Sequence, residues 1–153
     1  MRVPAATNYA VRALLELATA PGDPLPLHVI AERQQISHRF LEHIFRDLRA
    51  AGLVSSHRGG HGRGGYLLTV PVDRLTLASV VAALQPATGA LAELTGPGRE
   101  TSGHPGLDAV WLDLQRQIVD FLDDITIADL AGRAGATPPR PAPLEEHLTP
   151  GAG

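Results

Sequence analysis

A glycine-rich segment between two short apolar runs constrains the fold of this chain most strongly. Residues 58–66 read RGGHGRGGY and contain a literal G-x-G-x-x-G at Gly60, Gly62 and Gly65. A dinucleotide-binding fingerprint needs a strand before these glycines and a helix that opens inside them. Here the flanks are LVSSHR and YLLTV, which are both strand-like, and Pro71 ends the second. The pattern therefore predicts the tip of a β-hairpin, where glycine permits positive φ, and not a phosphate-binding loop.

Three amphipathic helices are predicted before this hairpin. Residues 7–20 carry apolar side chains at helical spacing, with Thr7 as a plausible N-cap and Pro21 as the stop. A second helix covers residues 27–35. A third follows Ser37, ends at Gly52 and has a clear core stripe. This stripe comprises Leu41, Ile44, Phe45, Leu48 and Ala51.

The opposite face of the third helix is polar and basic. It carries His38, Arg39, Glu42, His43, Arg46 and Arg49. Two helices joined by a tight turn, with such a face on the second, form a helix-turn-helix pattern. A hairpin directly after this pattern is typical of a wing. Arg63 near its tip is then placed to enter a minor groove, and Arg58 at its base to contact a phosphate.

The charge distribution is consistent with a DNA-facing N-terminal half. The net charge of -3 taken alone argues against nucleic acid. Residues 1–75, however, contain nine arginines and six carboxylates, whereas residues 76–153 contain four arginines and ten carboxylates. This asymmetry favours a basic part that faces DNA and an acidic part that does not.

The C-terminal half is predicted to contain a long helix at residues 107–125. Its apolar residues are spaced alternately by four and three positions, as in a coiled-coil seam. The seam comprises Leu107, Trp111, Leu114, Ile118, Phe121 and Ile125. Such a stripe must be buried, either against the winged domain or against a second copy of the helix, and a homodimer is the favoured reading.

The segments around this helix complete the predicted organisation. Thr76 caps a short helix over residues 76–84, and a Gly- and Pro-rich loop at residues 86–106 follows. Thr126 and Asp129 form a capping-box-like start to a last helix that ends at Ala131. We expect a winged domain at residues 1–75, a linker and dimerisation unit at 76–131, and a disordered Pro- and Gly-rich tail at 132–153.

Composition excludes several classes of function. The chain has no cysteine, so disulfides, thiol redox sensing and cysteine-ligated clusters are not available. Seven histidines leave metal binding open, but surface or phosphate-contacting roles fit their spacing better. No nucleophile–base pattern indicates an enzyme, and no cofactor is expected. Because we find no membrane-spanning run and no secretory signal, we expect a cytoplasmic protein that does not bind membranes.

Several segments together resemble the IscR, NsrR and CymR type of bacterial winged-helix regulator, the Rrf2 family. The resemblance rests on NYAVRALLELA, on LHVIAERQQISHRFLEHIFRDLRAAGLVSSHRGGHGRGGYLL, and on the W-x-D-L and ITIADL segments. It implies a mainly α fold with a small β-hairpin wing (α+β), a winged helix-turn-helix domain and a long C-terminal dimerisation helix. It also implies a homodimeric transcription factor that binds double-stranded DNA through the third helix and the wing.

The resemblance and the basic face together select the candidate DNA contacts. Base contacts are expected from Ser37, Arg39, Phe40 and Glu42, and phosphate contacts from Tyr9, His28 and Arg58. The remaining candidate DNA contacts are His38, His43, Arg46, His61 and Arg63.

This chain also departs from the family pattern. Many relatives bind an iron–sulfur cluster through three cysteines in the segment that corresponds to residues 86–106, and Asp108 stands where some have a histidine ligand. We therefore expect a regulator, most simply a repressor, modulated by a small molecule or a protein at residues 86–106. The alternative is a protein-interaction module that has lost sensing, with or without DNA binding.

Overall fold

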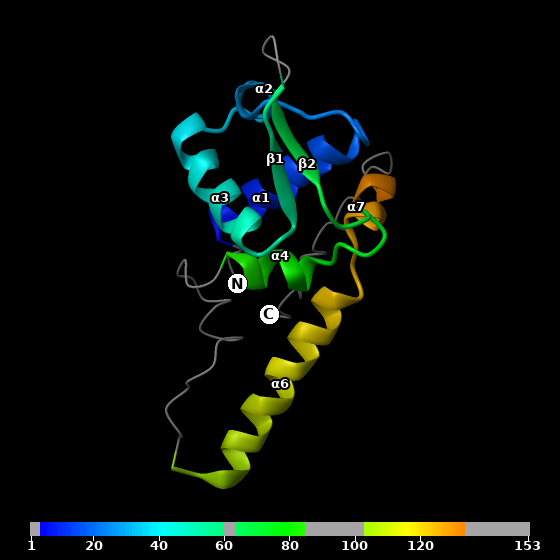
Figure 1. Cartoon of the computed structure of the whole chain (residues 1–153). Coiled ribbons are helices and arrows are strands. Elements are labelled where there is room, and N and C mark those ends of the chain that lie inside the picture. The colour runs from blue at the N-terminus through cyan, green and yellow to red at the C-terminus, as the bar shows by residue number, and fades with distance from the viewer. Residues whose placement is uncertain (1–3, 60–63, 85–102, 134–153) are drawn as a thin grey trace, which may run out of the picture.

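The computed structural model describes residues 4–59, 64–84 and 103–133. It has a helical body with a two-stranded antiparallel hairpin, and one long helix that projects from this body as an arm (Figure 1). The predicted class, mainly α with a β-hairpin wing, is confirmed. The elements are α1 (Ala5–Ala18), α2 (Leu27–Gln34), α3 (His38–Ala50), β1 (Val54–His57), β2 (Gly65–Leu68), α4 (Leu77–Ala83), α6 (Pro105–Asp123) and α7 (Ile127–Arg133).

The core of the body joins the predicted apolar stripes of α1 and α3. Leu14 of α1 and Leu41, Phe45 and Leu48 of α3 are fully buried. Ala51, which the stripe prediction included, is exposed because it lies at the C-cap of α3, where the helix leaves the core. Burial of these side chains is the main stabilisation of the body, at about 1.5–3 kcal/mol for each large one.

Both boundaries of α1 and the end of α2 differ from the prediction, and α1 ends at Ala18, two residues earlier than expected. α1 begins at Ala5, not after Thr7, because Pro4 occupies the N-cap and its carbonyl accepts from the Asn8 amide at 3.2 Å. α2 ends at Gln34, one residue before the predicted end, and its C-cap residue Gln35 has a φ of 53°, in the left-handed region. The third helix then starts at His38 as expected, although the Ser37 side chain makes no capping hydrogen bond.

The base of the wing is bonded to the body. The strands β1 and β2 pair from Val54 opposite Leu68 to His57 opposite Gly65. Tyr66 of β2 also pairs with Leu25, through amide-to-carbonyl bonds of 3.0 and 2.9 Å. The Tyr66 ring packs edge-on against the Phe45 ring, with centroids 4.7 Å apart. The hairpin therefore has a fixed position relative to α3.

The arm α6 begins at Pro105, two residues earlier than predicted. Proline is favoured in the first turn of a helix, and the His104 side chain caps it by accepting from the Leu107 amide. α6 ends at Asp123, so Ile125 is not on the arm as predicted. The Ile125 carbonyl instead accepts from the Leu77 amide at 2.8 Å. Of the predicted loop at residues 86–106, residues 86–102 lie outside the described residues.

The last helix, α7, returns the chain to the body. Ile127 is fully buried in the same core as the α1 residues, and its amide donates to the Leu75 carbonyl. The predicted capping box is present, because Thr126 and Asp129 exchange backbone-to-side-chain bonds of 2.9 and 3.1 Å. The Thr126 amide and hydroxyl both donate to the Asp129 carboxylate, at 2.9 Å each, and these two bonds hold the pKa of Asp129 below its ordinary value.

α7 extends to Arg133, two residues beyond the predicted end, and therefore takes the first two residues of the predicted tail. The rest of that tail, residues 134–153, lies outside the described residues.

Candidate nucleic-acid interface

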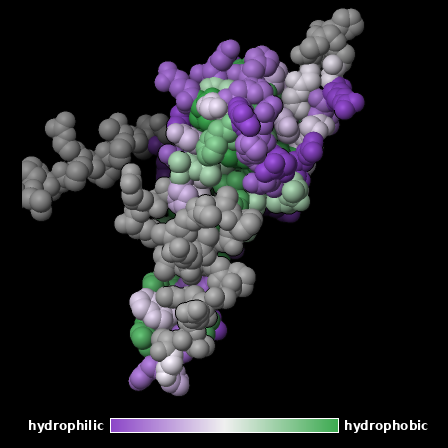
Figure 2. Space-filling view, turned by 90° about the vertical axis from the view of Figure 1, so that its left-hand side faces the viewer, coloured by the Kyte–Doolittle hydropathy of each residue, from purple (hydrophilic) through white to green (hydrophobic). Residues whose placement is uncertain are grey.

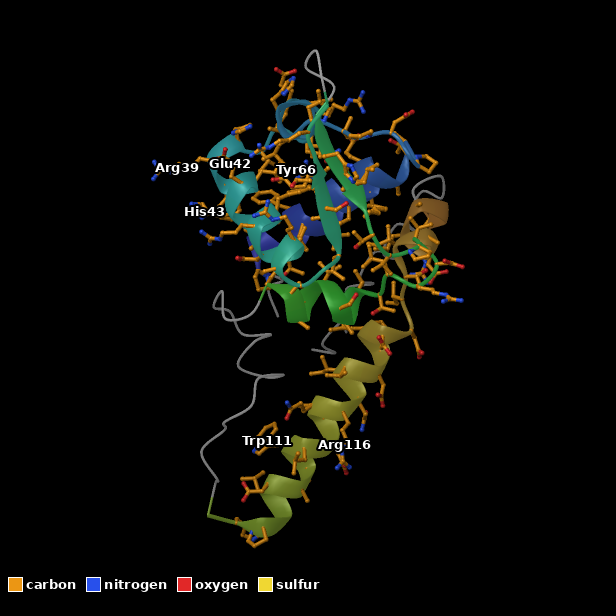
Figure 3. The ribbon with its side chains drawn as sticks, viewed as in Figure 1. Arg39, Glu42, His43, Tyr66, Trp111 and Arg116 are labelled. Atoms are coloured by element: carbon orange, nitrogen blue, oxygen red, sulfur yellow. The ribbon has the colours of Figure 1, made fainter. Side chains whose placement is uncertain are left out.

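The exposed face of α3 is a continuous polar surface. Burial of the apolar stripe directs the opposite side of the helix to solvent, and Arg39, Glu42, His43 and Arg46 lie on it at i, i+3, i+4 and i+7. Figure 3 shows Arg39, Glu42 and His43 on the outer side of α3, pointing away from the body. Within the described part of the chain, Arg39 makes no hydrogen bond or ion pair, so its guanidinium is available to a ligand.

Two charged groups on this face have neighbours on the same helix. His38 Nδ1 lies 3.6 Å from Glu42 Oε1, and Arg46 Nε lies 3.4 Å from Asp47 Oδ1. These are solvent-exposed pairs, which contribute little to stability and exchange readily for other partners. Neither pair therefore prevents the face from contacting DNA.

An aromatic pair lies under the first turn of α3. Phe40 is 38% exposed, and its ring meets the Tyr9 ring edge-on, with centroids 5.7 Å apart. Tyr9 itself is half-buried, so its position is fixed by the body. Phe40 thus presents an apolar edge beside the polar face of α3, which suits contact with a thymine methyl group.

A second set of polar groups extends this face toward the wing. Arg49 NH1 lies 3.4 Å from Ser56 Oγ and so connects the end of α3 with β1. Arg58 is exposed just beyond β1, and His28 is exposed in the first turn of α2. Arg49 was not among the predicted DNA contacts, although its spacing of ten residues from Arg39 places it on the same face.

The predicted wing-tip residues, His61 and Arg63, lie outside the described residues. Figure 2 looks onto the α3 side and shows hydrophilic side chains gathered over the upper body. The predicted contacts that the structure describes lie on α1, α2 or α3, at the N-cap of α3 (Ser37) or just beyond β1 (Arg58). The basic face and the base of the wing are therefore adjacent parts of one surface.

The arm carries a separate apolar surface. Apart from Phe40, every large exposed apolar side chain in the described residues lies on α6. On the predicted seam, Phe121 is 65% exposed, Leu107 42% and Leu114 37%, while Trp111 and Ile118 are half-buried. In Figure 3, Trp111 and Arg116 point to opposite sides of the helix. An exposed apolar stripe of this length is typical of a protein interface.

Neither a metal centre nor an active site is evident in the described residues. They contain no group of three histidine, aspartate or glutamate side chains close enough to hold a metal ion. Ser55 Oγ and His57 Nε2 do lie 3.1 Å apart, a serine–histidine contact that the sequence did not predict. Both residues, however, lie on β1 at the surface, and no described carboxylate pairs with His57. No described helix is both long and apolar enough to cross a membrane.

This geometry defines a class of protein. A helix-turn-helix with a polar second helix, followed by a two-stranded hairpin bonded to the body, is a winged-helix DNA-binding unit. The chain belongs to the Rrf2 family, described as iron-dependent transcriptional regulator, which matches residues 3–133. The resemblance inferred from the sequence is therefore confirmed. The protein is a DNA-binding transcriptional regulator, and regulators of this family are not enzymes.

Individual relatives agree with this assignment. The chain is 39% identical to the HTH-type transcriptional regulator IscR of Vibrio cholerae serotype O1 over 132 residues, which cover 85% of this chain and 75% of that protein. The solved structure of T. potens IscR is 31% identical, with a TM-score of 0.69 and coverage of 88% of each chain. The solved structure of CymR, the global cysteine regulator of B. subtilis, is 27% identical, with a TM-score of 0.70, and the match covers 86% of this chain and 97% of CymR.

The donor set of this chain does not fit an iron–sulfur cluster. The thiolates that hold such clusters come from cysteine, and none of the 153 residues is cysteine. The family's cluster chemistry is therefore not carried over to this protein.

Proposed function

We propose that the protein is a homodimeric repressor that binds double-stranded DNA with α3 in the major groove and the hairpin toward the minor groove. The observation that supports this most is the unobstructed polar face of α3 beside the base of the wing. Arg39 suits guanine O6 and N7, and Glu42 suits the amino group of cytosine. Arg46 and Arg49 follow them along α3, Arg58 lies just beyond β1, and all three suit phosphates.

The exposed apolar stripe of α6 supports the homodimer. A second copy of the helix would cover Leu107, Leu114 and Phe121 and would join two winged bodies. Paired recognition helices read two half-sites related by the twofold axis of the dimer. The alternative prediction, that the stripe packs on its own winged body, has less support, because among the described elements α6 meets the body chiefly at α4, near the C-terminal end of α6 (Figure 1).

The signal is proposed to act between the body and the arm. Residues 86–106 connect α4 with α6, so a small molecule or protein bound there would favour one arrangement of the two winged bodies. A tenfold difference in affinity for the two arrangements corresponds to about 1.4 kcal/mol. Because the chain has no cysteine, this signal cannot be a cysteine-ligated cluster.

Selection of duplexes from a randomised DNA library, followed by binding at several salt concentrations, tests the DNA-binding proposal. For about six phosphate contacts per dimer, log K should fall with log salt at a slope near about -5. Arg58→Ala should weaken binding to all DNA sequences alike. Arg39→Ala and Glu42→Ala should reduce the preference among sequences by about 1–3 kcal/mol each.

A slope near zero and no enriched sequence would overturn the proposal and support the alternative, a protein-interaction module. The repressor assignment has its own test, a reporter gene under a promoter that carries the selected sequence. Expression should fall when the protein is supplied. Increased expression would make it an activator.

A further inference from the structure

Arg12 of α1 caps the end of the neighbouring helix α2. Its Nε donates to the Gln34 side-chain carbonyl at 2.8 Å, and its NH2 group donates to the Gln34 backbone carbonyl at 2.5 Å. Gln34 is the last residue of α2, where backbone carbonyls have no partner within the helix. The fork geometry of a guanidinium allows one side chain to satisfy both acceptors.

The same guanidinium also lies over the Tyr9 ring of its own helix, and this ring leads to the start of α3. Its Cζ lies 5.6 Å from the centroid of the Tyr9 ring, within cation–π distance. The Tyr9 ring in turn meets the Phe40 ring in the first turn of α3. Arg12 therefore contacts the end of α2 directly and the beginning of α3 through one aromatic ring.

The turn between these helices needs such support. Only residues 35–37 separate α2 from α3, and Gln35 is the one non-glycine residue with positive φ in the described chain. That conformation is unfavourable for a residue with a Cβ. Ser37 contributes no side-chain cap to α3, so the turn depends on backbone bonds such as Ile36 amide to Ala31 carbonyl at 3.0 Å.

A second, more exposed set of bonds surrounds the Arg12 contact. The Gln34 side-chain amide donates to Glu16 Oε1 at 2.5 Å, and Glu16 Oε2 pairs with Arg33 at 3.2 Å. The Arg33 side chain is 54% exposed, so its ion pair is screened by solvent. Arg33 and Arg12 thus carry the same charge in one network, but only Arg12 bonds the backbone carbonyl at the end of α2, directly before the turn.

We propose that Arg12 is a positioning residue for DNA recognition, which holds the angle between α2 and α3 and so the insertion of α3. This inference rests on the proposed reading of bases by α3. Base contacts require correct placement within about 0.5 Å, whereas phosphate attraction tolerates misplacement. Loss of Arg12 should therefore lower specific affinity much more than non-specific affinity.

The test compares Arg12→Met, Arg12→Lys and the control Arg33→Ala. The probes are a duplex selected by the wild-type protein from a randomised library and a duplex of scrambled sequence. Both Arg12 variants should bind the selected duplex about tenfold more weakly or worse, and the scrambled duplex within about twofold of wild type, because only base contacts are lost. Arg33→Ala should bind both duplexes as the wild type does, and the salt slope should stay unchanged throughout.

Two results would overturn the inference. If Arg12→Met reduces the salt slope by about two per dimer and Arg12→Lys restores it, Arg12 is a phosphate contact. If both variants bind the selected duplex as wild type does, the network is dispensable for recognition. Circular dichroism establishes that each variant is folded, and Arg12→Lys carries the test alone if Arg12→Met unfolds. A wild-type protein that selects no duplex would overturn the proposed function itself.

Discussion

Replacement of Gly65 by alanine should detach the wing from the body. A Cβ at this position would lie 2.4 Å from the Leu25 carbonyl carbon, 2.5 Å from its oxygen and 2.7 Å from the Pro26 nitrogen. All three atoms belong to backbone, which cannot rotate away as a flexible side chain can. The β2 strand must therefore separate from the segment around Leu25.

The cost follows from the contacts that this separation breaks. Leu25 and Tyr66 would lose two backbone hydrogen bonds, at about 1 kcal/mol each. Displacement of Tyr66 from Phe45 would weaken an aromatic pair worth about 0.5–1.5 kcal/mol. Gly65→Ala should thus reduce the free energy of unfolding by about 2–4 kcal/mol.

Two other glycines provide matched controls. At Gly64 a Cβ would lie 3.0 Å from the His57 carbonyl oxygen, a tighter contact than usual that a small shift relieves. At Gly132, on α7, nothing lies within 4 Å, and alanine should stabilise the helix by about 0.5–1 kcal/mol.

Urea unfolding would rank the three variants. It should be done at one fixed protein concentration, because the stability of the proposed dimer depends on concentration. The expected order is Gly132→Ala above wild type, then Gly64→Ala, then Gly65→Ala. The reasoning would be refuted if Gly65→Ala were within about 0.5 kcal/mol of wild type, the range of an ordinary surface substitution.

Three further predictions concern the arm, the Thr126–Asp129 capping box and the signal. Phe121→Asp should give folded monomers in light scattering, because a charge in the dimer seam costs about 3 kcal/mol or more; Arg116→Ala should stay dimeric, and a dimeric Phe121→Asp would exclude this seam. Asp129→Ala should lower thermal stability at neutral pH. The pKa of Asp129 is lowered on folding, so its contribution to stability is present above the unfolded pKa of about 3.9 and is lost as pH falls through the folded pKa. The thermal stabilities of wild type and variant should therefore converge in acid, and a pH-independent difference would contradict this. Deletion of residues 88–103 should leave DNA binding intact but insensitive to the signal, and loss of DNA binding by a stable dimer would refute the proposed place of action.

Sequence patterns predicted those features of the structure that are formed by residues close in sequence. The apolar stripes of α1 and α3, the hairpin around the glycines and the Thr126–Asp129 capping box each arise from residues close in sequence. The spacing of apolar residues wrongly included Ile125 in the seam of α6. Ile125 continues the pattern of four and three, but the helix has already ended at Asp123. The bonds that turn the chain there involve Leu77, far away in sequence.

The contacts that position the candidate site are mostly long-range, which is why the sequence did not reveal them. Leu25 pairs with Tyr66 through backbone atoms, and backbone pairing leaves no mark on residue type. Arg12 could equally have been a surface cation, since nothing in its own helix shows that Gln34 lies opposite. The polar face of α3 was predictable because its residues share one helix.

The junction between body and arm connects the two proposed interfaces physically. Thr76 and Thr126 form an antiparallel β-bridge. Beside it, the Leu77 amide donates to the Ile125 carbonyl and the Ile127 amide donates to the Leu75 carbonyl, both at 2.8 Å. Thr76 Oγ1 also donates to Asp123 Oδ1 at 2.9 Å, directly at the end of α6. A change in how two arms cross would therefore either move each winged body with its arm or break bonds of about 1 kcal/mol each. A tenfold regulatory effect needs only about 1.4 kcal/mol, so movement of each body with its arm is less costly than breaking the junction bonds. In the proposed dimer, a signal would therefore change the spacing of the two α3 helices.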